Sequence, residues 1–317
     1  MSADSDLAVE ILDAVNDLAG RHSGHRALHA KGTLLTGTFT ATAEGGALTR
    51  AAHMQGEPVR VTARFSNGGG DPGGPDHGQD GRGLALKLYL EDGSTTDMVA
   101  VTLPVFMVRT PEDFLEFTRA RKPDPDTGKP DMVKVGAFLE AHPEALPAIQ
   151  ASLEAKRPVS YAQLRYNGIH AFRWTNADGD SRWVRFSWEP EAGEAGIEKD
   201  EARLRGDDYL LEEVAERVAG DGVSFRLVLQ LGEEGDPTDD PTQAWPEDRE
   251  TVVAARLELT GPDETRERDG DVLVFDPTRV PGGIEPSDDP ILHIRSHAYA
   301  ESVFRRSGLR RKEPANA

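Results

Sequence analysis

The sequence predicts an α+β fold in which helices surround a central antiparallel β-barrel. Several runs alternate apolar and polar residues with the period of two that half-buried strands show, for example residues 58–66 and 224–231. Residues 164–188 contain two such runs on either side of a turn signal at 176–180, which indicates a β-hairpin. The strands come mostly before the helices, and this order is consistent with an antiparallel barrel.

Helical periodicity is clearest in three parts of the chain. Residues 1–20 read as an amphipathic helix, because their apolar residues recur at helical spacing. Residues 111–157 begin with a proline and two acids, as helices often do, and are interrupted by Pro143 and Pro147. Residues 291–306 contain neither Gly nor Pro and are long enough for about four helical turns.

Composition limits the class of protein. The formal net charge of −20 argues against a nucleic-acid partner, and the absence of cysteine excludes disulfides and thiolate metal sites. There is no run of about 18 apolar residues that would span a membrane. The first residues are acidic where a signal peptide would be basic. We therefore expect a cytoplasmic protein without a membrane segment.

The last long helix carries a chemically suggestive pair. Arg295 and Tyr299 are four residues apart and so share a helical face, and Arg306 lies seven residues further on that face. A guanidinium held against a phenol oxygen favours the phenolate, which is a good ligand for a ferric ion. An Arg/Tyr pair at this spacing is also common on ordinary helices, so the pair alone leaves a surface or packing role open.

A histidine-rich segment precedes the first predicted strand. His22, His25 and His29 have spacings that would gather them on one helical face and suggest a three-histidine metal site. The β-like run that follows, residues 32–40, argues against a helix here. Individual histidines in such a segment are more often hydrogen-bonded core residues, so both interpretations stay open at this point.

The motifs together resemble those of the haem catalases. The segment VPGGIEPSDDPILHIRSHAY resembles the proximal-helix signature of that family, and further motifs follow the order of the family: HAKG (29–32), RFS (64–66), DGRG (80–83), PVF (104–106), HAF (170–172) and WPE (245–247). The resemblance covers residues 21–308. Because the chain ends just beyond the proximal helix, it is most similar to the small catalase-related peroxidases. The implied organisation is an N-terminal helix (1–20), one haem domain (21–308) and a basic tail (309–317).

The resemblance implies haem b, iron protoporphyrin IX, bound between the barrel and the proximal helix. Tyr299 would be the axial iron ligand, since haem iron in catalases is held by a tyrosine, and Arg295 would support it through a relay with His170 and Asp289. His29 would move the peroxide proton on the opposite face, with Ser66 fixing the orientation of its ring. The remaining implied contacts with haem are those of Arg26, Arg64 and Arg306 with the propionates and of Phe106 and Phe114 with the ring.

Four positions depart from the family pattern. The distal Asn of catalases falls on Val101 and its neighbour on Thr102, the second Phe falls on Met107, and Leu28 stands before His29 in place of Val. Val101 has no hydrogen-bond donor for peroxide, and Thr102 supplies one only if the local register turns it inward. Losing one preorganised donor costs about 10²–10³ in rate. We therefore expect weak catalase activity and relatively stronger peroxidase activity.

The predicted function is a haem peroxidase that reduces H2O2 or organic hydroperoxides with an organic electron donor. Two alternatives remain: isomerisation or cleavage of fatty-acid hydroperoxides, suggested by the altered pocket, and haem sensing without catalysis. The expected partners are a small peroxide and an organic reductant. A monomer or small homo-oligomer is expected, because the chain is without the long N-terminal arm and C-terminal helices of large catalases.

Overall fold

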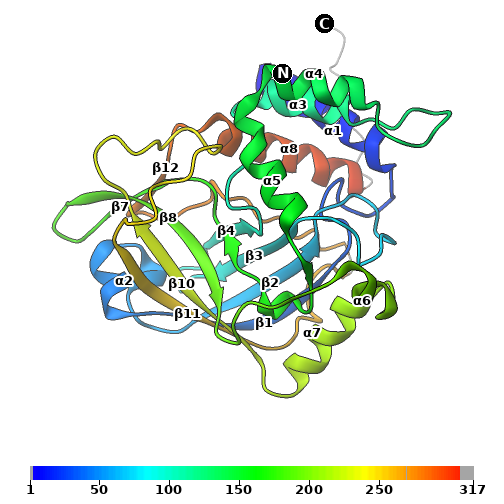
Figure 1. Ribbon diagram of the computed structural model, residues 1–317. Helices are drawn as coiled ribbons and strands as arrows, with labels where there is room; N and C mark the ends of the chain where they lie inside the picture. The colour runs from blue at the N-terminus through cyan, green and yellow to red at the C-terminus, as the bar shows by residue number, and fades with distance from the viewer. Residues whose placement is uncertain (1–2, 269, 308–317) are drawn as a thin grey trace, which may run out of the picture.

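An eight-stranded antiparallel barrel forms the centre of the computed structural model, which describes residues 3–268 and 270–307 (Figure 1). The strand order is β10-β11-β1-β2-β3-β4-β6-β8, and pairing of β8 with β10 closes the barrel. The predicted α+β class and antiparallel barrel are confirmed. The barrel strands are β1 (Gly32–Ala41), β2 (Val59–Asn67), β3 (Arg82–Tyr89), β4 (Thr95–Val101), β6 (Tyr166–Asn167), β8 (Ser181–Pro190), β10 (Val223–Leu231) and β11 (Thr251–Pro262).

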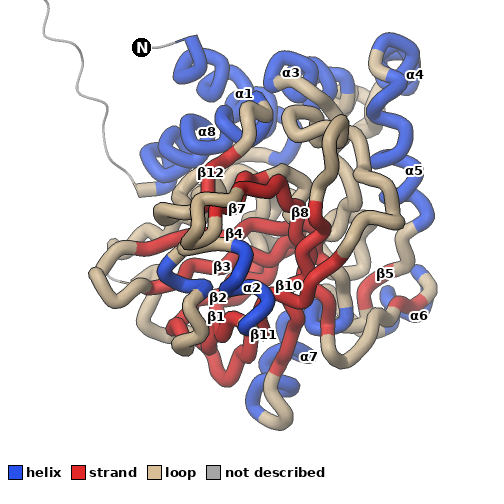
Figure 2. Tube along the Cα trace, turned by 90° about the vertical axis from the view of Figure 1, so that its left-hand side faces the viewer, coloured by secondary structure: helices blue, strands red, loops and turns tan. Residues whose placement is uncertain are grey.

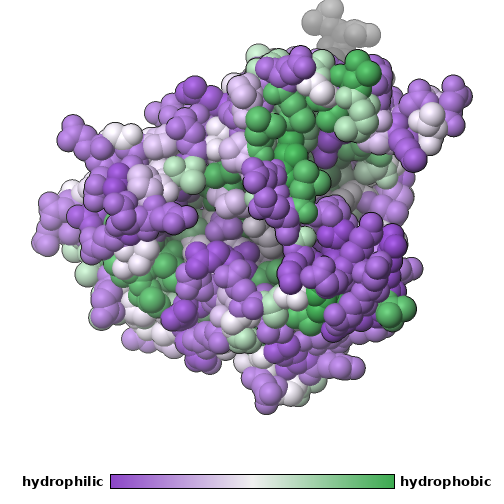
Figure 3. All heavy atoms as spheres, viewed as in Figure 1, coloured by the Kyte–Doolittle hydropathy of each residue, from purple (hydrophilic) through white to green (hydrophobic). Residues whose placement is uncertain are grey.

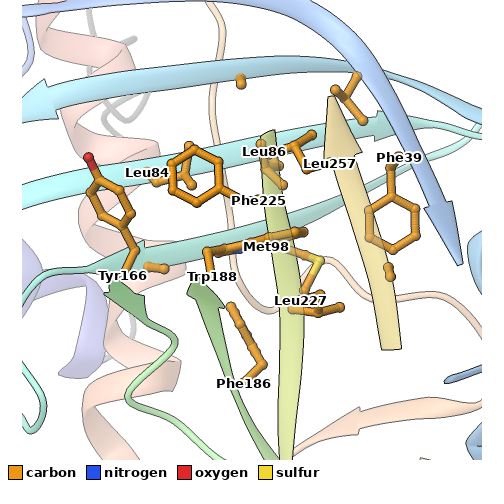
Figure 4. Close-up of a cluster of buried hydrophobic side chains, with 14 of the residues drawn as sticks. Phe39, Leu84, Leu86, Met98, Tyr166, Phe186, Trp188, Phe225, Leu227 and Leu257 are labelled. Atoms are coloured by element: carbon orange, nitrogen blue, oxygen red, sulfur yellow. The ribbon is translucent and has the colours of Figure 1, made fainter. Parts of the chain in front are cut away.

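The barrel interior is filled by apolar side chains. Alternate residues of β10 point inward, so Phe225, Leu227 and Leu229 are fully buried, as the sequence pattern of this strand predicts. Figure 4 shows Phe225 beside Tyr166, and the two ring centroids are 5.9 Å apart. Burying a large side chain of this kind contributes about 1.5–3 kcal/mol. Because these side chains fill the barrel interior, a ligand site is expected outside the interior and not within it.

The predicted hairpin at 164–188 is present but is interrupted. Residues 164–175 form two short strands, β6 and β7 (Phe172–Thr175), and both pair with β8. The chain leaves the sheet between them because Ile169 has a left-handed backbone, with φ of 60°. The strand β12 (Ile284–Pro286) pairs with β7 at the edge of the sheet, and β5 (Arg157–Pro158) pairs separately with β9 (Gly196–Ile197).

Three helices pack together at one end of the barrel, where Figures 1 and 2 show them side by side. They are α1 (Ala3–Ala19), α3 (Pro111–Ala120) and α8 (Pro290–Arg306). Ile11 and Val15 of α1, Leu115 of α3 and Ile294 of α8 share one buried apolar cluster. The N-terminal helix is therefore attached to the helix that carries Arg295 and Tyr299.

The other helices lie around the barrel and, at its helical end, against α3. The prolines at 143 and 147 end one helix and begin the next, as the sequence indicates. These elements are α2 (Ala43–Leu48), α4 (Met132–Ala141), α5 (Leu146–Glu154), α6 (Lys199–Leu204) and α7 (Tyr209–Ala219), with short 3-10 turns η1 (Ala52–Met54), η2 (Pro143–Ala145) and η3 (Tyr161–Gln163). The predicted basic tail, 309–317, lies outside the described residues.

The surface is mostly hydrophilic, as Figure 3 shows for one face, with an apolar band over α5 in the upper centre of the view. Exposed apolar side chains of α4 and α5 include Met132, Val133, Leu146 and Leu153. Within residues 3–268 and 270–307, every helix is too short or too polar to cross a membrane.

Candidate active site

The site begins at the N-terminus of α8, where one carboxylate connects this helix to the sheet. Asp289 Oδ1 accepts hydrogen bonds from the backbone N–H groups of Ile291 (2.8 Å) and Leu292 (3.3 Å), which caps the helix. Its other oxygen, Oδ2, accepts a hydrogen bond from His170 Nδ1 at 2.6 Å. Both side chains are buried. A buried carboxylate is stable only with such partners, so the position of α8 is tied to that of His170.

The chain of hydrogen bonds continues to Tyr299. His170 Nε2 accepts from Arg295 Nη1 at 2.9 Å, and Arg295 Nε donates to the phenol oxygen of Tyr299 at 2.8 Å. Because His170 donates through Nδ1 and accepts through Nε2, its ring is neutral. Burial lowers the pKa of His170, and the Asp289 carboxylate opposes this shift only in part. The four residues Asp289, His170, Arg295 and Tyr299 thus form one continuous series of hydrogen bonds.

The residue before His170 has a strained backbone, and His170 itself is bonded to Asp289 at the start of α8. Ile169 is β-branched, and such residues rarely adopt the positive φ of 60° found here. A conformation of this kind costs about 1–3 kcal/mol and is kept only where the surroundings enforce it. The preceding Gly168 packs against Phe186 so closely that a Cβ would lie 2.6 Å from its ring. The break between β6 and β7 therefore turns His170 out of the sheet.

His29 lies on the barrel side of the site. A hydrogen bond of 3.0 Å joins His29 Nδ1 to Ser66 Oγ on β2, and the His29 backbone N–H donates to Gly68 O at 3.1 Å. Gly83 on β3 leaves the room for this arrangement, because a Cβ there would lie 3.0 Å from the imidazole and 2.9 Å from Ser66 Oγ. The position of the ring is thus fixed by two adjacent strands.

Three arginines and burial keep His29 neutral. Burial is the largest cause that lowers the pKa of His29, to about 3, and the charges of Arg64, Arg295 and Arg26 lower it further in that order. With Nδ1 bonded to Ser66, Nε2 remains to accept a proton. The imidazole is therefore an unprotonated base at neutral pH.

The register of the sheet places Val101 on the same face as His29. Ser66 pairs with Gly83, and Gly83 pairs with Val101 on β4. Residues paired in this way point to the same side of an antiparallel sheet, and on this side the Gly83 position meets the His29 ring. The position predicted to replace the distal Asn thus carries an isopropyl group without a donor.

Thr102 is bonded to the start of β3. Its Oγ1 accepts from the backbone N–H of Arg82 at 3.0 Å, and its own N–H donates to Arg82 O at 2.9 Å. It also lines a small hollow of about 60 Å³ with Asp80 and Gly81. Within the described part of the chain, the structure does not bring Thr102 into a hydrogen bond with His29 or Ser66.

Apolar side chains join the two sides of the site. The rings of Phe106 and Phe114 stack with centroids 5.8 Å apart. Phe114 packs in the cluster that contains Leu28 and Ala298, the residues before His29 and Tyr299. Met107, another residue that departs from the family pattern, packs with Phe106 in a neighbouring cluster. One apolar region therefore borders both the histidine segment and α8.

A cavity of about 530 Å³ lies at the arginine end of the site, within the range of small-molecule sites. Arg26, Arg64 and Arg306 line it, and Gly32 makes room for Arg64, since a Cβ there would lie 2.9 Å from the guanidinium. Arg64 donates to Ala30 O at 3.2 Å. His29 and Tyr299 do not line this cavity, so it corresponds to one end of the site only.

One carboxylate pairs with these arginines. Glu267 forms ion pairs with Arg26 and with Arg306. The other acids of the cavity are bonded elsewhere: Asp263 to Thr62 and Thr265, Glu264 to Arg268, and Asp271 to Arg266.

Among the described residues, Arg26 and Arg306 share one carboxylate and Arg64 has no carboxylate within ion-pair distance. Burial lowers the pKa of Arg64 to about 9 and of Arg306 to about 10, so both are charged at neutral pH. Glu267 is thus the one carboxylate in ion pairs with these three arginines among the described residues, and the buried Nε of Arg306 has no hydrogen-bond partner. The residues present therefore fit a ligand with two carboxylates, as haem b has.

The three-histidine metal site considered from the sequence is wrong. His29 is bonded to Ser66, while His22 Nε2 lies 3.1 Å from Ala19 O, and the segment forms turns rather than a helix. Among residues 3–268 and 270–307, the possible metal ligands that gather within 4.8 Å are those of Asp113, His142 and Glu144.

Sequence reasoning missed Glu267. It lies in the charged run ETRERDGD, which has no periodicity or motif that distinguishes one acid from another. Its pairing with Arg26, which is 241 residues away, depends wholly on the fold.

The chain matches the family model described as catalase over residues 9–316. It is 42% identical to a catalase-related peroxidase of Mycolicibacterium paratuberculosis, covering 95% of each chain. It is 36% identical to a catalase-related peroxidase of Synechococcus elongatus, covering 94% of this chain and 88% of the relative.

Solved structures are similar as well. A fungal catalase superposes with a TM-score of 0.81 at 26% identity, covering 91% of this chain and 61% of that one. Catalase A from Saccharomyces cerevisiae gives a TM-score of 0.81 at 25% identity, covering 90% and 62%. The chain thus spans about three fifths of the length of these larger enzymes. With a matching family model and relatives over almost its whole length, the chain belongs to the catalase family.

Proposed function

We propose that this protein is a haem b peroxidase that reduces H2O2 or organic hydroperoxides with an organic electron donor and has weak catalase activity. Members of the catalase family are haem oxidoreductases that act on peroxides. The observation that supports the proposal best is the neutral His29–Ser66 pair bordering the same apolar region as Arg295 and Tyr299.

On the α8 side, Tyr299 would be the iron ligand. Haem, when bound, would supply a redox-active iron for the reduction of the peroxide. The hydrogen bond from Arg295 Nε stabilises negative charge on the phenol oxygen, and His170 with Asp289 holds Arg295 in place. Arg26, Arg64 and Arg306 would bind the two carboxylates of haem, and Phe106 with Phe114 would pack beside its ring.

On the barrel side, His29 would act as the acid–base group. Its free Nε2 takes the proton from one peroxide oxygen and returns it to the oxygen that leaves as water or an alcohol. Ser66 holds the ring in one orientation, and Gly83 leaves room for it. Thr102 would be a positioning residue rather than a peroxide donor, because its hydroxyl fixes the first residue of β3.

Val101 explains the expected preference for peroxidase over catalase chemistry. Catalase activity needs a second H2O2 to be oriented at the site, and an isopropyl group gives it no hydrogen bond. An organic donor transfers electrons without this requirement. The apolar region around Leu28 and Phe114 also suits organic hydroperoxides.

The first test is the replacement His29→Ala in haem-loaded protein. We expect the wild type to oxidise an organic donor with H2O2 and the variant to be slower by about 10²–10⁴, because the proton-transfer group is lost. Haem binding, followed by absorbance, should be retained. His22→Ala is the matched control, since His22 is bonded to Ala19 O outside the site.

Three results would contradict the proposal. Vigorous oxygen evolution without donor oxidation would indicate a true catalase, and rearranged products from a lipid hydroperoxide without a donor would indicate an isomerase. Equal activities of wild type and His29→Ala would favour a sensor.

The pH profile is a second prediction. His29 acts as a base only when it is neutral, that is above its pKa of about 3. We therefore expect kcat/KM for peroxide to stay level as the pH falls through about 6.5, where an ordinary histidine becomes protonated. Initial rates in a buffer series measure this, and a sigmoidal fall centred near 6.5 would show that His29 is not held neutral.

A third prediction concerns Val101→Asn, which adds an amide donor on the face of the sheet that His29 occupies. We expect oxygen evolution from H2O2 to rise by about 10² relative to donor oxidation. Oxygen-electrode and donor assays on the same haem-loaded sample give the ratio. The control is Val99→Asn, on the same face two residues further along β4, where it pairs with Ala85. An unchanged ratio in a folded, haem-binding Val101→Asn protein would refute the role assigned to this position.

A fourth prediction is that Tyr299→Phe removes the tyrosinate ligand. The ultraviolet–visible spectrum of haem-loaded protein should change from that of a tyrosinate-bound ferric haem, and donor oxidation should fall by at least about 10². Tyr209→Phe is the control, because this buried hydroxyl donates to Pro158 O on β5, outside the barrel. If Tyr299→Phe kept the wild-type spectrum, another residue would have to be the ligand.

A further inference from the structure

Glu267 bridges two of the arginines that line the cavity. Both terminal nitrogens of Arg26 donate to its carboxylate, Nη1 to Oε2 at 3.3 Å and Nη2 to Oε1, and Arg306 Nη1 donates to Oε1 at 3.4 Å. The same two arginines also share an acceptor, Leu273 O, at 3.0 and 2.6 Å. Arg26 and Arg306 are thus held together by groups of one loop although both are positively charged.

The backbone of Glu267 is held in an unfavourable conformation. Its φ of 56° makes it one of three non-glycine residues with positive φ among those the structure describes, and the other two are His29 and Ile169. Asp271 Oδ2 accepts the Glu267 backbone N–H at 3.1 Å and is itself paired with Arg266. Such strain persists only where the surroundings enforce it and is concentrated at functional sites. Glu267 is therefore placed at the arginines at an energetic cost.

Arg26 and Arg306, the two arginines paired with Glu267, are also among those proposed to bind the haem carboxylates. Arg26 uses both of its terminal nitrogens on Glu267, so an incoming carboxylate meets a guanidinium that is already engaged. The neighbouring acids of the cavity have other partners, and Glu267 alone among the cavity acids described is paired with Arg26 and Arg306.

We propose that Glu267 is a positioning residue for cofactor uptake. It holds Arg26 and Arg306 together before haem binds, and the two arginines then leave Glu267 and bind the carboxylates of the incoming haem. This inference rests on the proposed haem function. Glu267 stabilises the cofactor-free chain by offsetting repulsion between the arginines. It also competes with a carboxylated ligand for the same nitrogens, so it slows uptake.

The test is Glu267→Gln in the full chain freed of haem, with uptake followed by stopped-flow absorbance. Two probes are used: iron protoporphyrin IX with free carboxylates, and its dimethyl ester, which has none. We expect the variant to take up the free acid about tenfold faster than the wild type, because one competing negative charge is gone. Uptake of the ester should change by less than about twofold. The melting temperature of the cofactor-free variant should fall by about 2–4 °C.

Glu264→Gln is the matched control, because it removes the same charge from the same cavity at a residue paired with Arg268. It should leave uptake of both probes unchanged. Glu267→Ala provides a second variant and should accelerate free-acid uptake as Glu267→Gln does.

Three outcomes would overturn the inference. They are unchanged or slower free-acid uptake in both Glu267 variants, equal acceleration of acid and ester, and the same acceleration in Glu264→Gln. A wild-type chain that binds neither probe would overturn the haem function and this inference with it, whereas normal binding with any of the three outcomes would overturn the role of Glu267 alone.

Discussion

The site depends on the carboxylate of Asp289. This one group accepts two backbone N–H groups of α8 and the Nδ1 proton of His170, so it fixes both the start of the helix and the tautomer of the histidine. The start of α8 also determines where Arg295 and Tyr299 lie, since both are on one face of the helix at fixed distances from its first residue. Three donors stabilise this buried carboxylate, whereas a buried carboxylate without them would destabilise the fold. Stability and the geometry of the Tyr299 side therefore rest on the same hydrogen bonds.

On the barrel side, the constraint is space rather than charge. Gly83 lets the imidazole of His29 lie against β3, and Gly32 lets the Arg64 guanidinium lie against β1. Three non-glycine residues with positive φ lie at the site. His29 is itself bonded to Ser66, Ile169 precedes His170, and Glu267 is paired with Arg26 and Arg306. Strain at these places is kept because the closed barrel and its packed interior hold the surrounding chain.

The sequence predicted much of this structure because much of it is local. Strand alternation and the run without Gly or Pro at 291–306 reflect periodicities of single elements, and the barrel and α8 agree with them. Other features depend on contacts between distant segments. The hairpin at 164–188 read as two continuous strands, yet Ile169 leaves the sheet because His170 bonds to Asp289, 119 residues away. Glu267 likewise lies in a charged run in which no pattern distinguishes it from the other acids. The register that places Val101 on the same face as His29 depends on the pairing of β3 with β4.

The same cations serve both ends of the site. Burial lowers the pKa of His29 most, and the charges of Arg64, Arg295 and Arg26 lower it further. Arg64 and Arg26 also line the arginine cavity, and Arg295 donates to Tyr299. Replacing one of these arginines to weaken cofactor binding would therefore also raise the pKa of the base. The chain as a whole is strongly acidic, with a net charge of −20, so this cationic interior is a local exception to its composition. Two acids of the cavity, Glu264 and Asp271, form ion pairs with Arg268 and Arg266 and not with Arg26, Arg64 or Arg306. The positive charge that remains is thus available both to bind carboxylates and to hold His29 neutral.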